Sequence, residues 1–287
     1  MRRFQYHAPN SLAEASRLLR ELGETASLFA GGTDLLVEIR EELRVCAHVI
    51  DIKKIPGLRE LSFDEENGLQ IGAQTTAREI ETSPVVRTKY PNLASAVAAL
   101  GSIQVRNRAT LIGNICRASP SADTLPPLIA DGAVLTIWSE GGARSLPIER
   151  FFVGPGKTIL ARGEIVIGVI IPPPRPASAR IYIKHGRRKA MELATVGVAV
   201  SVDRAGGFCR DVRIALGAVA PTPIRAVRAE AVLRGKNITP SRIVEAAEAA
   251  IAESTPISNV RASAEYRREM VGVLTRRAIE VVTGALQ

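Results

Sequence analysis

Residues 26–36, with the sequence ASLFAGGTDLL, decide how the chain begins to fold. Residues 26–30 have the apolar character and the length of a β-strand, and apolar residues then recur at helical spacing from Leu35 to Leu43. The two glycines between these elements let the backbone turn tightly, and the free N–H groups at the start of a helix attract anions. The stretch therefore predicts a strand, a glycine turn and a helix, with the geometry of an anion site at the turn.

The glycine turn on its own does not decide between a ligand site and an ordinary connection. It lacks the G-x-G-x-x-G spacing of a dinucleotide-binding Rossmann turn, and it lacks the lysine of a P-loop. Short motifs often mislead, so the turn taken alone favours an ordinary strand-to-helix connection with two glycines over a ligand site.

The segments around this stretch extend it into a compact β-loop-α-β unit. Ser11 and Glu14 form the pattern of a capping box, and the helix that they begin ends at Gly23. A second strand is predicted over 48–52, after the helix that follows the glycines. The first part of the chain is therefore one structural unit with the glycine turn at its centre.

The middle of the chain mixes short strands and helices before a run of prolines. Strands are predicted over 68–73, 133–138 and 165–171, and helices over 92–100 and 125–130. Residues 109–123 are predicted to be irregular, because glycine, asparagine, serine and proline interrupt them repeatedly. The run PPPRP at 172–176 cannot continue a sheet or a helix, so the domain boundary is predicted there.

Beyond the prolines the pattern changes to strands followed by helices. The strands are predicted over 180–184, 195–203 and 209–219, with a hairpin turn at 205–207. Pro240 occupies the first helical position of the helical remainder. This order indicates an α+β domain, in which an antiparallel sheet packs against helices.

A second candidate ligand site is the segment 110–124, TLIGNICRASPSADT. Its small polar residues can hydrogen-bond a ligand, and the backbone of a buried loop needs partners. Asp123 precedes the helix predicted at 125–130, so a role as its N-cap is the alternative. Cys116 has no cysteine or histidine beside it, which argues against a metal site. No Ser/His/Asp or Cys/His arrangement is indicated, so no catalytic residue is predicted.

Length and composition indicate an ordinary globular chain. It has 287 residues, of which 46% are hydrophobic and 23% charged, and this length favours about two domains. The net charge is +9, but the basic residues are dispersed and only 4% of residues are aromatic, which disfavours nucleic-acid binding. No apolar run reaches the ~20 residues of a transmembrane helix, and no secretory signal is recognised. The three scattered cysteines fit a reducing, cytoplasmic location.

Four motifs, found in order, resemble the signature of one family. They are AGGTDLL at 30–36, QVRN at 104–107, the segment 110–124 and FFVGPGKT at 151–158. The likeness continues through KHGRR at 184–188 and ATVGVA at 194–199, so it covers nearly the whole chain. The family is the FAD-binding (medium) subunit of the molybdenum hydroxylases, such as xanthine dehydrogenase and carbon monoxide dehydrogenase.

The resemblance implies a fold as well as a cofactor. An α+β chain is expected, with a two-lobed FAD-binding domain of the vanillyl-alcohol-oxidase (PCMH) type over 1–175. Its lobes are expected at about 1–55 and 56–175, and a smaller domain of antiparallel sheet and helices is expected over 176–287.

The resemblance also implies which residues bind FAD without a covalent bond. Two loops are expected to hold the pyrophosphate through their backbone amides, Asp123 to contact ribityl or adenosine hydroxyls, and Lys184 to lie near the flavin. The full set is Leu28, Phe29, Ala30, Gly31, Gly32, Thr33, Asp34, Leu35, Leu100, Thr110, Leu111, Ile112, Gly113, Asn114, Asp123, Val166 and Lys184. The family usually has Gly-Gly-Asn where this chain has Ile112-Gly113-Asn114, so the isoleucine is expected to crowd the second loop.

The activity implied by the resemblance is that of an oxidoreductase subunit. Electrons are expected to pass from the [2Fe-2S] clusters of a small partner subunit, through FAD, to NAD, a quinone or another acceptor. The substrate is expected to react at molybdopterin on a large partner subunit, in a dimer of heterotrimers. The three cysteines of this chain are too few for one cluster, which needs about four thiolates. A stand-alone FAD- or NAD-dependent oxidoreductase and a basic nucleic-acid-binding protein are the alternatives.

Overall fold

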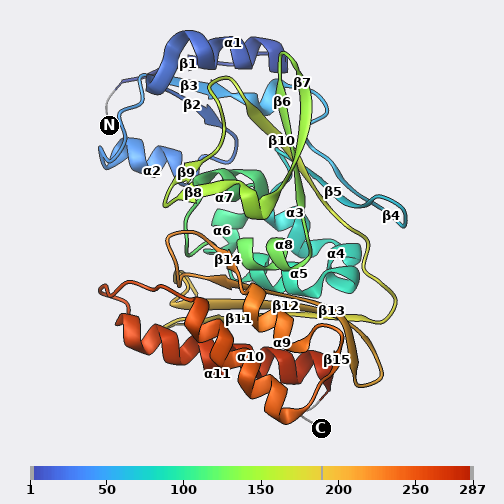
Figure 1. Ribbon diagram of the computed structural model, residues 1–287. Helices are drawn as coiled ribbons and strands as arrows, with labels where there is room; N and C mark the ends of the chain where they lie inside the picture. Colours follow the sequence, from blue (N-terminus) through green and yellow to red (C-terminus); the bar gives the residue numbers. More distant parts are fainter. Residues whose placement is uncertain (1–2, 189, 285–287) are drawn as a thin grey trace.

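In the computed structural model, which describes residues 3–188 and 190–284, the chain forms three units that follow one another down Figure 1. The first unit is a parallel three-stranded sheet in the order β1-β3-β2. Its strands are β1 (Gln5–His7), β2 (Ala26–Phe29) and β3 (His48–Asp51). Because β3 lies in the centre, β2 is an edge strand.

Two helices cover opposite faces of this first sheet. Ala15 of α1 (Leu12–Leu22) packs with Ile50 in the main hydrophobic core. Ile39 of α2 (Leu35–Arg40) packs with Val49 in a separate small core. Ser11 caps α1 by accepting a hydrogen bond from the N–H of Glu14, which is one half of the predicted capping box. The Glu14 carboxylate accepts from the N–H of Asn10 instead of that of Ser11, so the reciprocal half is not formed.

The second unit is an antiparallel five-stranded sheet in the order β4-β5-β10-β6-β7, with short helices beside it. Its strands are β4 (Leu61–Asp64), β5 (Gly68–Gly72), β6 (Val134–Ser139), β7 (Gly142–Pro147) and β10 (Ile165–Ile171). Its helices are α3 (Ala77–Thr82), α4 (Pro84–Lys89), α5 (Pro91–Ala98), α6 (Ile103–Arg106), α7 (Leu111–Arg117) and α8 (Leu125–Ala130). Strands β8 (Phe152–Gly154) and β9 (Lys157–Thr158) form a small separate hairpin.

The third unit is a second antiparallel sheet with three helices. The strands are β11 (Ser178–His185), β12 (Val196–Ala205), β13 (Phe208–Gly217) and β14 (Ile224–Arg225), and β15 (Lys236–Asn237) pairs with β13. The helices are α9 (Val227–Leu233), α10 (Pro240–Glu253) and α11 (Ala264–Thr283). The sheet lies between these helices and helices α5 and α8 of the second unit (Figure 1).

Strand β11 joins the second and third units through its alternating side chains. Ile181 and Ile183 pack on the core of the third unit. Arg180, Tyr182 and Lys184 point the other way, because successive strand residues face opposite sides of a sheet. They contact aspartates of the second unit. One face of β11 is therefore apolar and the other is a polar domain contact.

Residues 109–123 correct a prediction from the sequence, because they are not irregular throughout. Helix α7 occupies Leu111–Arg117. The hydroxyl of Thr110 caps it by accepting a hydrogen bond from the N–H of Gly113 at 3.0 Å. Leu111 and Ile115 are buried, so the cap and the packing outweigh the poor helix propensity of glycine and asparagine.

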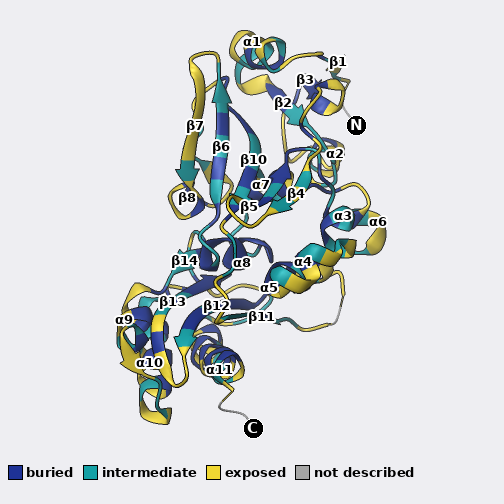
Figure 2. Ribbon diagram, turned by 90° about the vertical axis from the view of Figure 1, so that its right-hand side faces the viewer, coloured by how far each residue is buried: buried dark blue, intermediate teal, exposed yellow. Residues whose placement is uncertain are grey.

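Burial follows the sheets. Figure 2 shows buried residues along the central strands of both larger sheets, while the outward side of α10 is exposed. The cores of the second and third units are separate clusters of buried side chains. None of the helices in residues 3–188 and 190–284 combines the length and the apolar character that a membrane crossing requires.

Candidate cofactor cleft

A cleft of about 700 Å³ opens between the first and second units. It is lined by β2 and the glycine turn on one side and by α7 and the residues before β10 on the other. Leu193 is the residue that the third unit contributes to this lining, among those that the structure describes. Ligand pockets of globular proteins commonly measure about 300–1,000 Å³, so the cleft has room for a large small molecule.

The glycine turn has a conformation that other residues do not readily adopt. Gly32 has a φ of +73°, and a Cβ atom there would lie 2.2 Å from Cε2 of Phe29. A Cβ atom on Gly31 would lie 2.2 Å from the carbonyl oxygen of Arg108. Gly31 therefore lets the turn pack directly against the backbone that leads to α7, and the two predicted loops meet.

Backbone donors of this turn remain free within the protein. The N–H groups of residues 31–34 donate no hydrogen bond to any residue in the described part of the chain. The carbonyl oxygen of Gly32 accepts a hydrogen bond from the N–H of Leu36 at 3.1 Å, which fixes the turn onto α2. Consecutive N–H groups in such a turn form an anion-binding concavity.

The second segment reaches the cleft as the first turn of α7 rather than as a loop. Gly113 and Asn114 line the cleft there, and Asn114 accepts a hydrogen bond from the hydroxyl of Thr124 at 2.6 Å. The first N–H groups of a helix have no intrahelical partner. Ile112 stands where the family usually has glycine, and its side chain is only 4% exposed within the main core.

These features fit a dinucleotide such as FAD. Two joined phosphates need several converging donors, and the turn supplies the unpaired N–H groups of residues 31–34. The N–H groups of Gly113 and Asn114 in α7 already donate to Thr110, so α7 contributes the positive end of its helix to the same space. Ser27 on β2 also lines the cleft, and its buried hydroxyl has no hydrogen-bond partner among the described residues. Buried polar groups are rarely left unpaired, so this hydroxyl is a further group that suits a polar ligand.

Most of the residues predicted for the site come together in this cleft. Those that line it are Leu28, Ala30, Gly31, Gly32, Thr33, Asp34, Leu35, Leu100, Thr110, Ile112, Gly113, Asn114 and Val166. The other four lie outside the lining. Phe29 packs with the small core under α2 and Leu111 with the main core, whereas Asp123 and Lys184 form an ion pair with each other at 2.8 Å.

The ion pair between Asp123 and Lys184 is buried at the contact of the second and third units. The ammonium of Lys184 lies 2.8 Å from one carboxylate oxygen, and the hydroxyl of Tyr182 donates to the other at 2.8 Å. Burial raises the pKa of Asp123, and the charge of Lys184 opposes this rise. Burial also raises the pKa of Tyr182 far above its usual value, so its hydroxyl keeps its proton.

Several residues that line the cleft were not predicted from the sequence. Ser27, Arg117, Arg162 and Leu193 are examples. Arg117 is paired with Glu38 at 2.8 Å. Ser27 and Arg117 lie within the two segments singled out from the sequence, whereas Arg162 and Leu193 lie outside every motif, so only the fold reveals that the last two are neighbours of the cleft.

The cleft holds no obvious group for metal or thiol chemistry. Cys116 lines it, but burial raises the pKa of this thiol to about 12, so it stays protonated. Within residues 3–188 and 190–284, no three histidine, cysteine, aspartate or glutamate side chains are grouped so that they could hold a metal ion.

Family models and relatives match the whole of this architecture. The model of the FAD binding domain in molybdopterin dehydrogenase matches residues 2–174. The model of the CO dehydrogenase flavoprotein C-terminal domain matches residues 181–282. The two matches divide the chain at the proline run.

Relatives are similar over nearly their full length. The carbon monoxide dehydrogenase medium chain of Hydrogenophaga pseudoflava is 36% identical over 277 residues, with 96% of each chain covered. The xanthine dehydrogenase FAD-binding subunit of Escherichia coli is 32% identical over 281 residues, which cover 98% of this chain and 96% of that one.

A solved structure agrees with this fold. The structure of carbon monoxide dehydrogenase from Hydrogenophaga pseudoflava superposes with a TM-score of 0.94 at 37% identity, over 98% of this chain and 97% of that chain. The resemblance in sequence, the two-lobed cleft and the separate C-terminal sheet therefore have one explanation. The chain belongs to the family of FAD-binding medium subunits of molybdenum hydroxylases of the xanthine and carbon monoxide dehydrogenase type.

Proposed function

We propose that this chain is the FAD-carrying electron-transfer subunit of a heterotrimeric molybdenum hydroxylase. The observation that supports this most directly is the cleft, where the backbone N–H groups of residues 31–34 have no partner in the described chain. Such donors bind phosphate oxygens, and the first turn of α7 faces the same space. The pyrophosphate of FAD is the group that this arrangement suits.

The individual contacts to FAD are part of the proposal. The backbone of Leu28–Leu35 and of Thr110–Asn114 would hold the pyrophosphate, and Leu100 and Val166 would cover apolar parts of the cofactor. Asp123 would contact ribityl or adenosine hydroxyls and Lys184 would lie near the flavin, with the two side chains held together by their ion pair at 2.8 Å. The domain boundary is proposed at 175/176, between the end of β10 at Ile171 and the start of β11 at Ser178.

The partners follow from the same proposal. A bound flavin exchanges one electron at a time with iron–sulfur clusters and two with NAD or a quinone. The clusters would lie on a small partner subunit and molybdopterin on a large one, in a dimer of heterotrimers in the cytoplasm. Relatives that carry the word medium in their names support a multi-subunit assembly.

The substrate would be chosen by another subunit. Relatives of this chain include the nicotine 6-hydroxylase medium subunit of Paenarthrobacter nicotinovorans and a chain of quinoline 2-oxidoreductase from Pseudomonas putida. Chains of one fold thus occur with different substrates, so the chemistry of the substrate is expected outside this chain.

Purification of the tagged chain from its native host tests the proposal. We expect a yellow complex with one FAD per chain, released by acid into the supernatant, and two further subunits in native mass spectrometry. A preparation without flavin absorption would refute the proposed role altogether. A flavin-containing homo-oligomer that turns over a substrate alone would instead establish the stand-alone oxidoreductase.

A further inference from the structure

Glu38 and Arg117 form an ion pair that crosses the cofactor cleft. A carboxylate oxygen of Glu38 lies 2.8 Å from Nη2 of Arg117, and both side chains line the cleft. Glu38 belongs to α2 of the first unit, and Arg117 is the last residue of α7 in the second unit. The Arg117 side chain is 42% exposed, so this cross-cleft ion pair lies at the opening of the cleft.

Helix α2 carries the turn that has the free N–H groups. The N–H of Leu36 donates to the carbonyl of Gly32 at 3.1 Å, and the N–H of Glu38 donates to the carbonyl of Asp34 at 2.9 Å. These hydrogen bonds join residues 32–34 to the first turn of α2. A displacement of α2 would therefore also displace the turn.

Helix α2 has few attachments to the second unit. Its buried residue, Ile39, packs in the small core of the first unit. Among the residues that the structure describes, Arg117 is the only polar partner of α2 that belongs to the second unit. Gly31 packs on the backbone of Arg108 at the other end of the turn, so the cross-cleft ion pair is a second, separate attachment.

Each member of the pair is also held within its own unit. The carbonyl of Ala118, next to Arg117, accepts a hydrogen bond from the N–H of Gly156 at 2.9 Å. Arg44 lies 3.5 Å from the other carboxylate oxygen of Glu38. Because Glu38 has this second guanidinium beside it, loss of Arg117 does not leave the carboxylate without a partner.

We propose that the cross-cleft ion pair slows the release of bound cofactor, because it holds α2, and with it the turn at residues 31–34, against α7. This inference rests on the proposed binding of FAD in the cleft. Glu38 and Arg117 carry opposite charges, so the pair adds little net attraction for a phosphate. Its effect comes from the attachment of α2.

The rate of FAD release from the purified complex tests this role. Arg117→Met and Glu38→Gln should each speed release about two- to fivefold, as expected for the loss of a partly exposed ion pair, and flavin fluorescence after dilution measures the rate. The double variant should be no faster than the single variants, because the second change removes nothing more. Arg117→Lys should restore part of the slow release. Additive effects in the double variant would overturn the proposal.

Glu38→Gln distinguishes attachment from simple attraction between charges. If Arg117 acted by attracting the phosphates directly, removal of the neighbouring negative charge would slow the release of FAD. Slower release in Glu38→Gln would therefore overturn the proposal. In 1 M salt, where the Debye length is about 3 Å, the difference between wild type and Arg117→Met should shrink.

Arg40 provides the matched control. It also lies on α2, and its guanidinium is 2.9 Å from the carboxylate of Glu41, but neither residue lines the cleft. Arg40→Met changes the net charge as Arg117→Met does, and it should leave the rate of FAD release unchanged. Equal acceleration by both variants would show that net charge sets the rate, and it would overturn the proposal.

Hydrogen exchange of the full chain without FAD supplies an independent measurement. Amide exchange in a peptide covering 35–39 should become about two- to fivefold faster in Arg117→Met and stay unchanged in Arg40→Met. Unchanged exchange in Arg117→Met would overturn the inference. If the wild-type chain binds no FAD, the proposed function fails, whereas exchange at 35–39 still decides whether the ion pair holds α2.

Discussion

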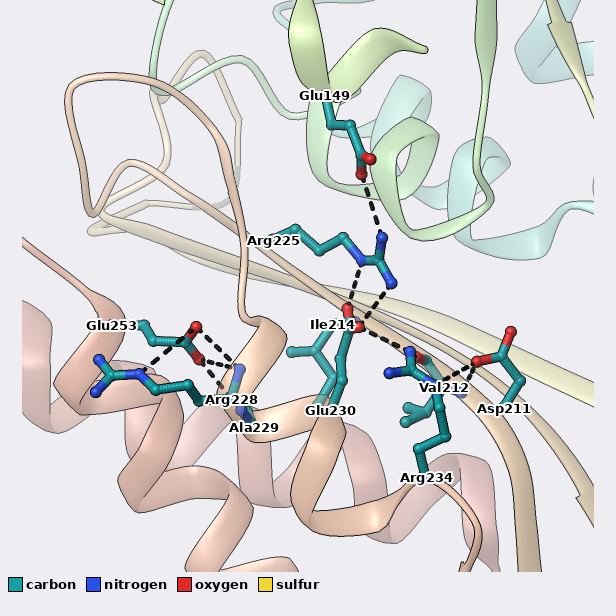
Figure 3. A network of polar contacts seen from close by, with 10 residues as sticks. All are labelled: Glu149, Asp211, Val212, Ile214, Arg225, Arg228, Ala229, Glu230, Arg234 and Glu253. Atoms are coloured by element: carbon teal, nitrogen blue, oxygen red, sulfur yellow. Dashed lines mark hydrogen bonds and ion pairs between the residues drawn. The ribbon is translucent and has the colours of Figure 1, made fainter.

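The cofactor cleft and the charged network around Glu230 differ in whether their polar groups have partners within the protein. At the cleft, the N–H groups of residues 31–34 have no partner in the described chain. Glu230 is fully buried, and its carboxylate accepts hydrogen bonds from Arg225, Arg234 and the backbone N–H of Ile214 (Figure 3). The unpaired N–H groups of the cleft are available to bind a ligand, whereas the paired charged side chains around Glu230 stabilise the fold.

The network also reaches across the domain contact. Arg225 binds Glu230 through two hydrogen bonds of 2.8 Å. Its remaining nitrogen lies 3.5 Å from the carboxylate of Glu149, which belongs to the second unit (Figure 3). One guanidinium thus has a buried partner in its own domain and a partly exposed partner in the other. Substituting Glu230 and Glu149 in turn therefore compares a buried partner with a partly exposed partner of the same guanidinium.

The largest effect is expected from Gly32→Val, which should abolish FAD binding. Valine disfavours the φ of +73°, and its Cβ would lie 2.2 Å from the ring of Phe29, so the turn must change. Loss of two charge-assisted hydrogen bonds would weaken FAD binding by about two to four orders of magnitude. FAD titration followed by flavin fluorescence measures this.

Gly206→Val is the matched control for that variant. Gly206 also has a positive φ, +58°, but a Cβ there meets nothing within 4 Å, and it lies in the hairpin between β12 and β13. It should lose some stability and keep full FAD affinity. If both variants lost FAD equally, the turn at Gly32 would have no special role.

Among substitutions in the network, Glu230→Gln should lower the free energy of unfolding the most. It leaves two arginines around a buried site without their common carboxylate, and breaking a buried ion pair typically costs about 3–5 kcal/mol of unfolding free energy. Urea unfolding followed by circular dichroism measures the loss. The folded fraction should bind FAD with unchanged affinity, and a parallel loss of affinity would contradict the division between the two regions.

A smaller, pH-dependent effect on the free energy of unfolding is expected for Glu164→Gln. Glu164 lines the cleft, but its carboxylate is paired within the protein. Two hydrogen bonds from Arg144, at 2.7 and 2.9 Å, lower the pKa of this carboxyl below 4.5. The pair therefore stabilises the fold above pH 4.5, and this stability is lost as the pH falls through the lowered pKa. The unfolding free energies of wild type and Glu164→Gln should differ by about 1 kcal/mol or less at neutral pH and converge in acid.

The smallest effect on the free energy of unfolding is expected for Glu149→Gln. Glu149 and Arg225 are 33% and 22% exposed, and partly exposed pairs at 3.5 Å contribute about 0–1 kcal/mol. The free energy of unfolding should hardly change, although the same guanidinium is involved as in Glu230→Gln. A loss as large as that of the buried variant would show that the contact between the domains, and not burial, dominates the network.

The parts of the fold that local patterns encode were predicted from the sequence. The β-branched run over Ile165–Ile171 is strand β10 with the same bounds. The glycine turn lies between β2 and α2 as expected. In each case the deciding physics is local, because side-chain alternation and glycine conformation act over a few residues.

The surroundings of Asp123 could not be predicted in this way. Asp123 is not the N-cap of α8, because that position is held by Thr124 without a side-chain cap. Its partners, Tyr182 and Lys184, are 59 and 61 residues away in the chain. Their meeting depends on how β11 packs against the second unit, and no spacing in the sequence records that packing.

Strand β2 carries one more consequence. It forms the edge of the first sheet, and Ala26, Ser27 and Leu28 line the cleft, so a bound cofactor would cover this edge. An uncovered edge strand offers unpaired backbone groups on which another chain can add a strand. Protein made in cells starved of riboflavin should therefore aggregate more, and its recovery as dispersed material should rise when the vitamin is supplied during expression.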